Sequence, residues 1–172
     1  MERKAIIRRA ARILGILMGF ACIPPALADA QTISYKSVAG GREEERDALL
    51  CMPKGEGPFQ VVIFNHGSVV DGSGWPGASS QGYRLDRVCE ALASEGFVTF
   101  APIRETSPRG RGFDRYEEKY REIVMHAVDH AKTLPKADAS RIALAGFSMG
   151  GLVSFLVSTD RSDLRALALL AP

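Results

Sequence analysis

The sequence predicts an α/β domain with a mostly parallel sheet, helices on both of its faces and an antiparallel pair of leading strands. From residue 59 onward, strand-like segments alternate with amphipathic helical segments, whereas the two strand-like segments before it have no helix between them. Residues 61–64 are continuously apolar, which is typical of a strand buried on both faces.

Each element of this prediction follows from its own pattern of apolar residues. Short apolar or alternating runs predict strands over residues 32–38, 46–52, 59–64, 97–101, 142–145 and 165–170. Apolar positions at helical spacing predict a helix over 83–94, a long helix from Asp114 to about Leu134, and a helix that follows Gly146 and runs to about Ser158.

The bulk composition is that of one folded domain. The 172 residues are 46% hydrophobic and 24% charged, and the formal net charge is +2. Five of the 22 Lys and Arg residues fall within the first 12 positions, so the remainder has no basic excess. We therefore expect no nucleic-acid partner.

Residues 1–30 have the organisation of an export signal. A basic stretch over 1–12 precedes an apolar stretch over 13–23, which is shorter than the roughly 20 residues that span a bilayer. Ala28-Asp29-Ala30 then offers a small-residue cleavage site. This pattern predicts a cleaved signal peptide, a domain over 31–172, a periplasmic or secreted location, and no membrane contact after cleavage. The alternative is an uncleaved N-terminal anchor.

Two cysteines follow the leader, Cys51 and Cys89. In an exported chain they could pair, and their spacing fits no metal-binding or redox motif. Of the two possibilities, the sequence favours two separate buried thiols over a disulfide.

A G-x-S-x-G pattern lies where a strand is expected to give way to a helix. It consists of Gly146, Phe147, Ser148, Met149 and Gly150. A sharp turn of this kind presents a serine nucleophile at the edge of the sheet, and it needs small neighbours so that strand and helix can approach closely. The pattern predicts that Ser148 is a catalytic nucleophile at a helix N-terminus, where partial positive charge favours a developing anion.

A second motif, Asn65-His66-Gly67-Ser68, directly follows the expected strand 59–64. Such a turn can direct a backbone N–H toward the nucleophile, so the N–H groups of Ser68 and Met149 are the predicted oxyanion donors. We expect the His66 side chain to shape the loop by hydrogen bonding, because it follows the strand too closely to act as a catalytic base.

Together these motifs resemble the α/β-hydrolase superfamily, and within it the dienelactone hydrolase-like and prolyl-oligopeptidase-like branch. The resemblance rests on residues 61–68, an apolar strand ending in His-Gly, and on 141–151, which contain Gly-Phe-Ser-Met-Gly-Gly. It implies an α/β-hydrolase fold over about residues 32–172. Dienelactone hydrolases proper carry a cysteine nucleophile, so Ser148 departs from them.

The superfamily order is nucleophile, acid, histidine, and no histidine follows Ser148. We expect Asp160 and Asp163 to be solvated turn residues far from Ser148. His126 and His130 are one helical turn apart, and we expect surface or half-buried side chains rather than a metal site. The prediction is an α/β-hydrolase fold that is incomplete at the C-terminus, with the acid and base encoded after Pro172.

The sequence thus predicts an exported serine hydrolase that cleaves an ester or related acyl bond of a small-molecule substrate, with no metal and no organic cofactor. The alternative is an inactive chain that serves as a binding module. Trp75, in the loop 71–82, either lines an acyl pocket or lies on the surface. Arg104, Arg109 and Arg111 either attract an anionic substrate or, as the sequence favours, are solvated loop residues. The substrate and the oligomeric state do not follow from the sequence.

Overall fold

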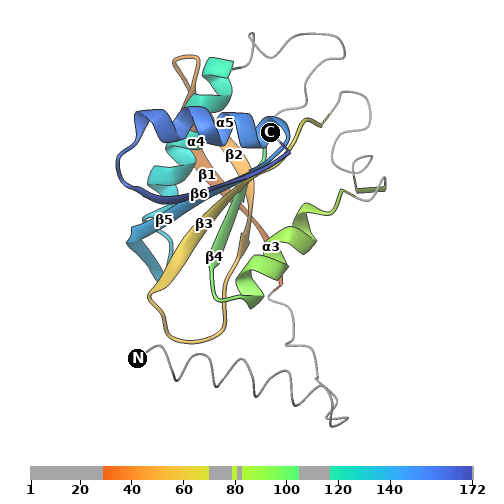
Figure 1. The fold of residues 1–172 in the computed structure, drawn as a ribbon, viewed down its shortest axis with the longest axis vertical. Helices are drawn as coiled ribbons and strands as arrows, with labels where there is room; N and C mark the ends of the chain where they lie inside the picture. Colours follow the sequence, from red (N-terminus) through yellow and green to blue (C-terminus); the bar gives the residue numbers. More distant parts are fainter. Residues whose placement is uncertain (1–28, 70–78, 81–82, 105–116, 172) are drawn as a thin grey trace.

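A computed structural model describes residues 29–69, 79–80, 83–104 and 117–171, which form a sheet with helices on both faces (Figure 1). The strands are β1 (Gln31–Ala39), β2 (Arg42–Cys51), β3 (Phe59–Asn65), β4 (Val98–Pro102), β5 (Ala137–Phe147) and β6 (Leu164–Leu170). The helices are α3 (Leu85–Ser94), α4 (Glu117–Ala131) and α5 (Met149–Asp160).

The strand order across the sheet is β1-β2-β4-β3-β5-β6. β1 pairs antiparallel with β2, and β2 pairs antiparallel with β4. All other pairs, β4 with β3, β3 with β5 and β5 with β6, are parallel. The predicted fold class, a mostly parallel sheet with an antiparallel leading pair, is confirmed.

Two strands are longer than the apolar pattern predicts. β2 begins at Arg42 rather than residue 46, because its polar first half pairs along the length of β1 and is joined to it by the exposed Lys36–Glu43 ion pair at 2.9 Å. β5 begins at Ala137 rather than residue 142, where Ala137 lies opposite Phe59 of β3. Backbone pairing therefore extends both strands through residues whose side chains remain largely in solvent.

The two faces of the sheet bury alternate residues of the central strands. Val61 and Ile63 of β3 pack in the main core with α4 and α5, whereas Phe64 packs with α3 on the opposite face. Figure 1 shows α4 and α5 together on one side of the sheet and α3 on the other. The apolar run in β3 is thus explained by burial on both faces.

The prediction of two separate thiols is wrong. Cys51, at the end of β2, and Cys89, on α3, are fully buried and form a disulfide with Cα atoms 5.7 Å apart. The sequence could not reveal this, because the two residues are 38 positions apart and meet only when α3 packs on β2.

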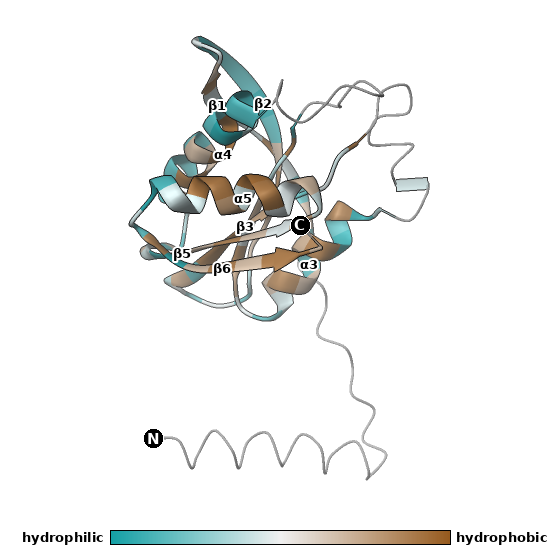
Figure 2. Cartoon of the chain, turned by 45° about the horizontal axis from the view of Figure 1, so that its top comes forward, coloured by the Kyte–Doolittle hydropathy of each residue, from teal (hydrophilic) through white to brown (hydrophobic). Residues whose placement is uncertain are grey.

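One edge of the sheet presents apolar side chains to solvent. Leu167, Leu169 and Leu170 of β6 are exposed, as are Leu152 and Phe155 of α5, and Figure 2 shows the apolar colour running along both elements. Over the ranges that the structure describes, no helix is both long enough and apolar enough to cross a membrane. The predicted signal peptide lies almost wholly in residues 1–28, outside the described residues, and stays a prediction.

Candidate active site

Ser148 occupies a sharp turn between β5 and α5. Its backbone has φ 51° and ψ −125°, a conformation that costs a non-glycine residue of order 1–3 kcal/mol. The Ser148 N–H donates to the Leu170 carbonyl of β6 at 2.9 Å, and its own carbonyl accepts the N–H of Gly151 at 2.8 Å. These bonds tie the turn to the neighbouring strand and begin the helix.

The turn exists only because two glycines allow backbones to touch. A Cβ on Gly146 would lie 2.2 Å from the Gly150 carbonyl oxygen, and one on Gly150 would lie 2.0 Å from the Asn65 carbonyl oxygen. No side chain fits at such distances, so the first turn of α5 packs directly on the ends of β3 and β5.

The turn after β3 lies against the serine. A Cβ on Gly67 would be 3.4 Å from the Ser148 Cβ, and the Gly67 N–H donates to the Tyr83 hydroxyl at 2.6 Å. Gly67 is buried, whereas Ser68 is exposed and Ser148 is half-buried. The two predicted motifs therefore come together at one end of the parallel strands.

The two predicted oxyanion donors belong to the turns that meet at Ser148. Met149 is the first residue of α5, so its N–H is among those that a helix leaves without an intrahelical acceptor. In the turn after β3, the Gly67 N–H is occupied by the Tyr83 hydroxyl, and the Ser68 N–H stays the predicted donor. Donors at a helix N-terminus and in an adjacent turn are the arrangement that stabilises a developing oxyanion.

The imidazole of His66 is buried and fully engaged. Its Nε2 accepts the Arg104 N–H at 2.9 Å, so the proton is on Nδ1, which lies 2.6 Å from the Gly67 carbonyl oxygen and donates to it. Burial, followed by the nearby charge of Arg104, holds the pKa of His66 well below its usual value. His66 is therefore neutral, and neither ring nitrogen is available to Ser148.

Two contacts that support the site do not follow from the sequence. Asn65 Nδ2 donates to Ser154 Oγ at 2.7 Å, and both side chains are fully buried, which links the end of β3 to α5. Tyr83 lies just before α3 and orients Gly67. The sequence shows Asn65 only as a polar residue that ends an apolar strand. Its contact could not be predicted, because its partner Ser154 is 89 positions away.

Arg104 is not the solvated residue that the sequence favours, because only 2% of its surface is exposed. Its guanidinium donates to the His66 carbonyl and lies over the Tyr120 ring, 5.3 Å from the centroid. Burial lowers its pKa to about 10. Arg109, Arg111 and Trp75 lie outside the described residues.

The two acids that follow Ser148 in the sequence lie at the far end of α5 from it. Asp160 ends α5, and Asp163 precedes β6, where they form exposed ion pairs with Arg121 and with Lys132 respectively. A 12-residue helix places them some 18 Å from its start.

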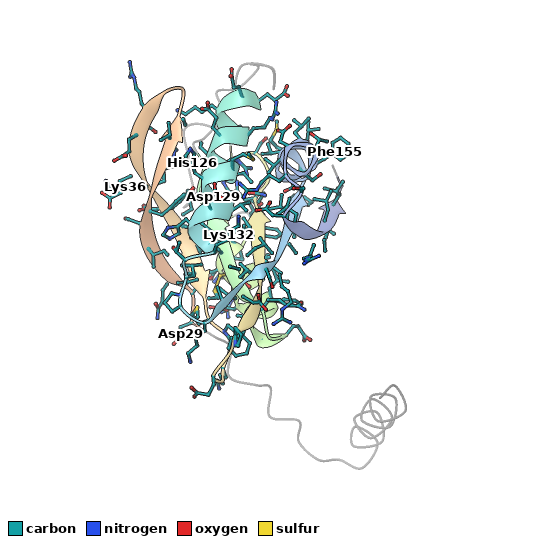
Figure 3. All side chains as sticks on the ribbon, turned by 90° about the vertical axis from the view of Figure 1, so that its left-hand side faces the viewer. Asp29, Lys36, His126, Asp129, Lys132 and Phe155 are labelled. Atoms are coloured by element: carbon teal, nitrogen blue, oxygen red, sulfur yellow. A yellow bond between two sulfur atoms is a disulfide. The ribbon has the colours of Figure 1, made fainter. Side chains whose placement is uncertain are left out.

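His126 and His130 are half-buried on α4, and Figure 3 shows His126 beside Asp129 and Lys132 along that helix. No group of three or more side chains able to hold a metal occurs within the described ranges.

The chain is similar to proteins of known sequence and of known structure. Over 69 residues it is 32% identical to "Uncharacterized peptidase YtmA" of Bacillus subtilis (strain 168), a match that covers 40% of this chain and 27% of that protein.

Three solved structures share the fold. An acylaminoacyl peptidase of Pyrococcus horikoshii has a TM-score of 0.60 and 17% identity, covering 84% of this chain and 24% of that one. A dienelactone hydrolase-like promiscuous phosphotriesterase from metagenomic libraries has a TM-score of 0.59 and 16% identity, covering 81% and 58%. An α/β-hydrolase enzyme from the metagenome of Lake Arreo, Spain, has a TM-score of 0.57 and 19% identity, covering 91% and 45%.

The chain thus spans between a quarter and three fifths of the length of these proteins. Residues 47–170 match the family described as "Dienelactone hydrolase family", a range that includes both motifs of the site. The chain belongs to the dienelactone hydrolase family, a family of hydrolases, and its sheet and helices have the α/β-hydrolase fold.

Proposed function

We propose that this chain carries the nucleophile and the oxyanion donors of an exported serine hydrolase that cleaves an ester or related acyl bond. The observation that carries the proposal is the strained turn at Ser148, held at the N-terminus of α5 and against Gly67. A strained backbone that is maintained by close glycine contacts is typical of a nucleophile turn, and it supports the role of Ser148 as the group that attacks an acyl carbonyl.

In the proposed reaction, Ser148 Oγ attacks the acyl carbonyl and its proton passes to a base. The carbonyl oxygen becomes an oxyanion, which accepts the N–H groups of Ser68 and Met149, each such donor contributing roughly 3 kcal/mol in comparable sites. The bond to the leaving group then breaks, the leaving group takes the proton, and an acyl-enzyme remains. Water repeats the sequence and releases the acid.

The base is the part of this reaction that the described residues do not supply. The chain has three histidines, of which His66 is occupied by Arg104 and Gly67, while His126 and His130 lie on α4. We therefore expect the proton of Ser148 to pass to a base that is not among the described residues.

The test is a fluorophosphonate probe applied to the product of the complete reading frame. We expect one phosphonylated serine, identified by peptide mass spectrometry as Ser148, and no labelling of Ser148→Ala. Ser158→Ala is the matched control, since it removes a serine at the far end of the same helix and should label normally. An unlabelled wild-type protein that is shown to be folded would refute the proposal.

The occupied state of His66 also favours a second candidate, a non-catalytic binding module with the same fold. In that case a small acyl ligand binds near Ser148 without turnover, and its Kd is the same for wild type and Ser148→Ala. A hydrolysis rate that disappears in Ser148→Ala excludes this candidate.

Export is part of the proposal and rests on the organisation of residues 1–30. Expression of the complete reading frame in a Gram-negative host should yield a periplasmic protein whose N-terminus begins near residue 31. A cytoplasmic product that retains Met1 would contradict it.

A further inference from the structure

Arg104 is a buried cation that the proposed reaction does not use directly. It lies just after β4 and is 2% exposed. Among the residues that the structure describes, no carboxylate pairs with it and its Nη1 has no hydrogen-bond partner. Burying a guanidinium removes it from water at a cost in free energy that its contacts within the protein must offset.

All the polar contacts of Arg104 that the structure shows are made to His66. Its backbone N–H donates to Nε2 at 2.9 Å, and its guanidinium donates to the His66 carbonyl oxygen. The guanidinium also lies over Tyr120 of α4, a cation–π contact that fixes its position. Arg104 thus joins the end of β4, the turn after β3 and α4.

The contacts of Arg104 affect the proposed oxyanion donor, the Ser68 N–H, through the imidazole of His66. Because Nε2 accepts from Arg104, the ring proton is on Nδ1, which donates to the Gly67 carbonyl oxygen at 2.6 Å. That carbonyl belongs to the same planar peptide group as the Ser68 N–H, so holding the oxygen sets the direction of the N–H. The His66 carbonyl oxygen that the guanidinium holds is also the one on which Gly150 packs.

We propose that Arg104 is a positioning residue that fixes His66 and, through it, the orientation of the Ser68 N–H toward the oxyanion. This inference rests on the proposed function. Arg104 acts on the transition state only through the turn, so its loss should lower kcat and leave KM nearly unchanged.

The test compares Arg104→Met with Arg104→Lys in the product of the complete reading frame. Met retains packing on Tyr120 but cannot donate, and we expect kcat to fall by about tenfold to hundredfold, with KM within about twofold and Tm within a few degrees. Lys can still donate to the His66 carbonyl and should recover part of kcat. Arg141→Met, on a half-buried arginine in the middle of β5 that pairs with Asp138, is the control and should change neither parameter.

A second readout does not depend on turnover. Hydrogen exchange of the Ser68 amide, and of the His66 Nδ1–H seen by NMR, should accelerate in Arg104→Met while the amides of β3 and β5 are unchanged. A merely structural role would not produce this local change without a fall in Tm.

Three results overturn the proposal in distinguishable ways. A folded wild-type protein that a fluorophosphonate does not label refutes the proposed function itself. A labelled wild type with unchanged kcat in Arg104→Met refutes the role of Arg104. A large fall in Tm in both the Met and Lys variants, with kcat reduced in parallel, shows that the arginine only supports the fold.

Discussion

At the scale of single residues, the backbone at Ser148 stores conformational strain. Its φ of 51° lies in the left-handed region that glycine enters freely and other residues avoid. We expect Ser148→Gly to be more stable than Ser148→Ala by about 1 kcal/mol, because both lose the hydroxyl and only Gly relieves the strain. Urea denaturation of the two variants measures this difference. Equal stability would show that the turn is not strained in solution.

Gly150 illustrates the opposite case, in which space rather than φ requires glycine. A methyl group there would lie 2.0 Å from the Asn65 carbonyl oxygen, which belongs to the backbone of a central strand and cannot easily move. We expect Gly150→Ala to lower the free energy of unfolding by at least about 3 kcal/mol. Gly40→Ala is the control, because a Cβ at this position would meet nothing within 4 Å. Only its φ of 60° is unfavourable for Ala, and this should lower the free energy of unfolding by about 1–2 kcal/mol. Equal losses would contradict the close approach of α5 and β3.

His66 should make stability depend on pH. Its pKa in the folded protein is well below the usual 6.5, mainly because of burial, so below about pH 6.5 the unfolded chain binds a proton that the folded protein does not. The free energy of unfolding should therefore fall with decreasing pH, by at most about 1.4 kcal/mol per unit from this group. His66→Gln should show a shallower fall between pH 6.5 and 5 in urea denaturation. An identical slope would mean that His66 is protonated in the folded state.

At the scale of elements, the disulfide joins β2 to α3 across 38 positions. A loop of that length corresponds to about 4 kcal/mol in the chain-entropy description of the unfolded state. We expect reduction to lower Tm in calorimetry, and a Cys51→Ala/Cys89→Ala double variant to be insensitive to the reductant. Free thiols at both positions in the purified, oxidised protein would refute the bridge.

The elements also show what the sequence could and could not predict. β3 and the elbow were predictable because continuous apolar residues and a Gly-x-Ser-x-Gly turn are local signals. The early starts of β2 and β5 were not, since they depend on backbone pairing with a neighbouring strand.

The residues of the candidate site show the same difference between local and long-range signals. Gly146, Gly150 and His66 could be predicted because they belong to local sequence motifs. The role of Tyr83 and the burial of Arg104 could not, because both depend on how distant elements pack.

At the scale of the whole molecule, the two edges of the sheet differ in chemistry. β1 carries polar and charged side chains such as Lys36, whereas β6 presents Leu167, Leu169 and Leu170. Phe155 of α5, the helix that leads into β6, is exposed as well, and Figure 3 shows Lys36 and Phe155 on opposite sides of the molecule. β6 is the outermost strand among the described residues. An apolar strand edge of this kind is a template for pairing with another chain.

This contrast predicts that the 172-residue chain self-associates through β6. Leu169 is 37% exposed, so Leu169→Lys should cost little stability while charging the edge, and the apparent mass in light scattering should fall toward 18.6 kDa. Ser34→Lys adds the same charge at an exposed position of β1 and should leave the apparent mass of the associated chain unchanged. If Ser34→Lys disperses the chain equally well, net charge rather than the β6 edge controls association. If the wild type is already monomeric at high concentration, the apolar edge does not pair in solution.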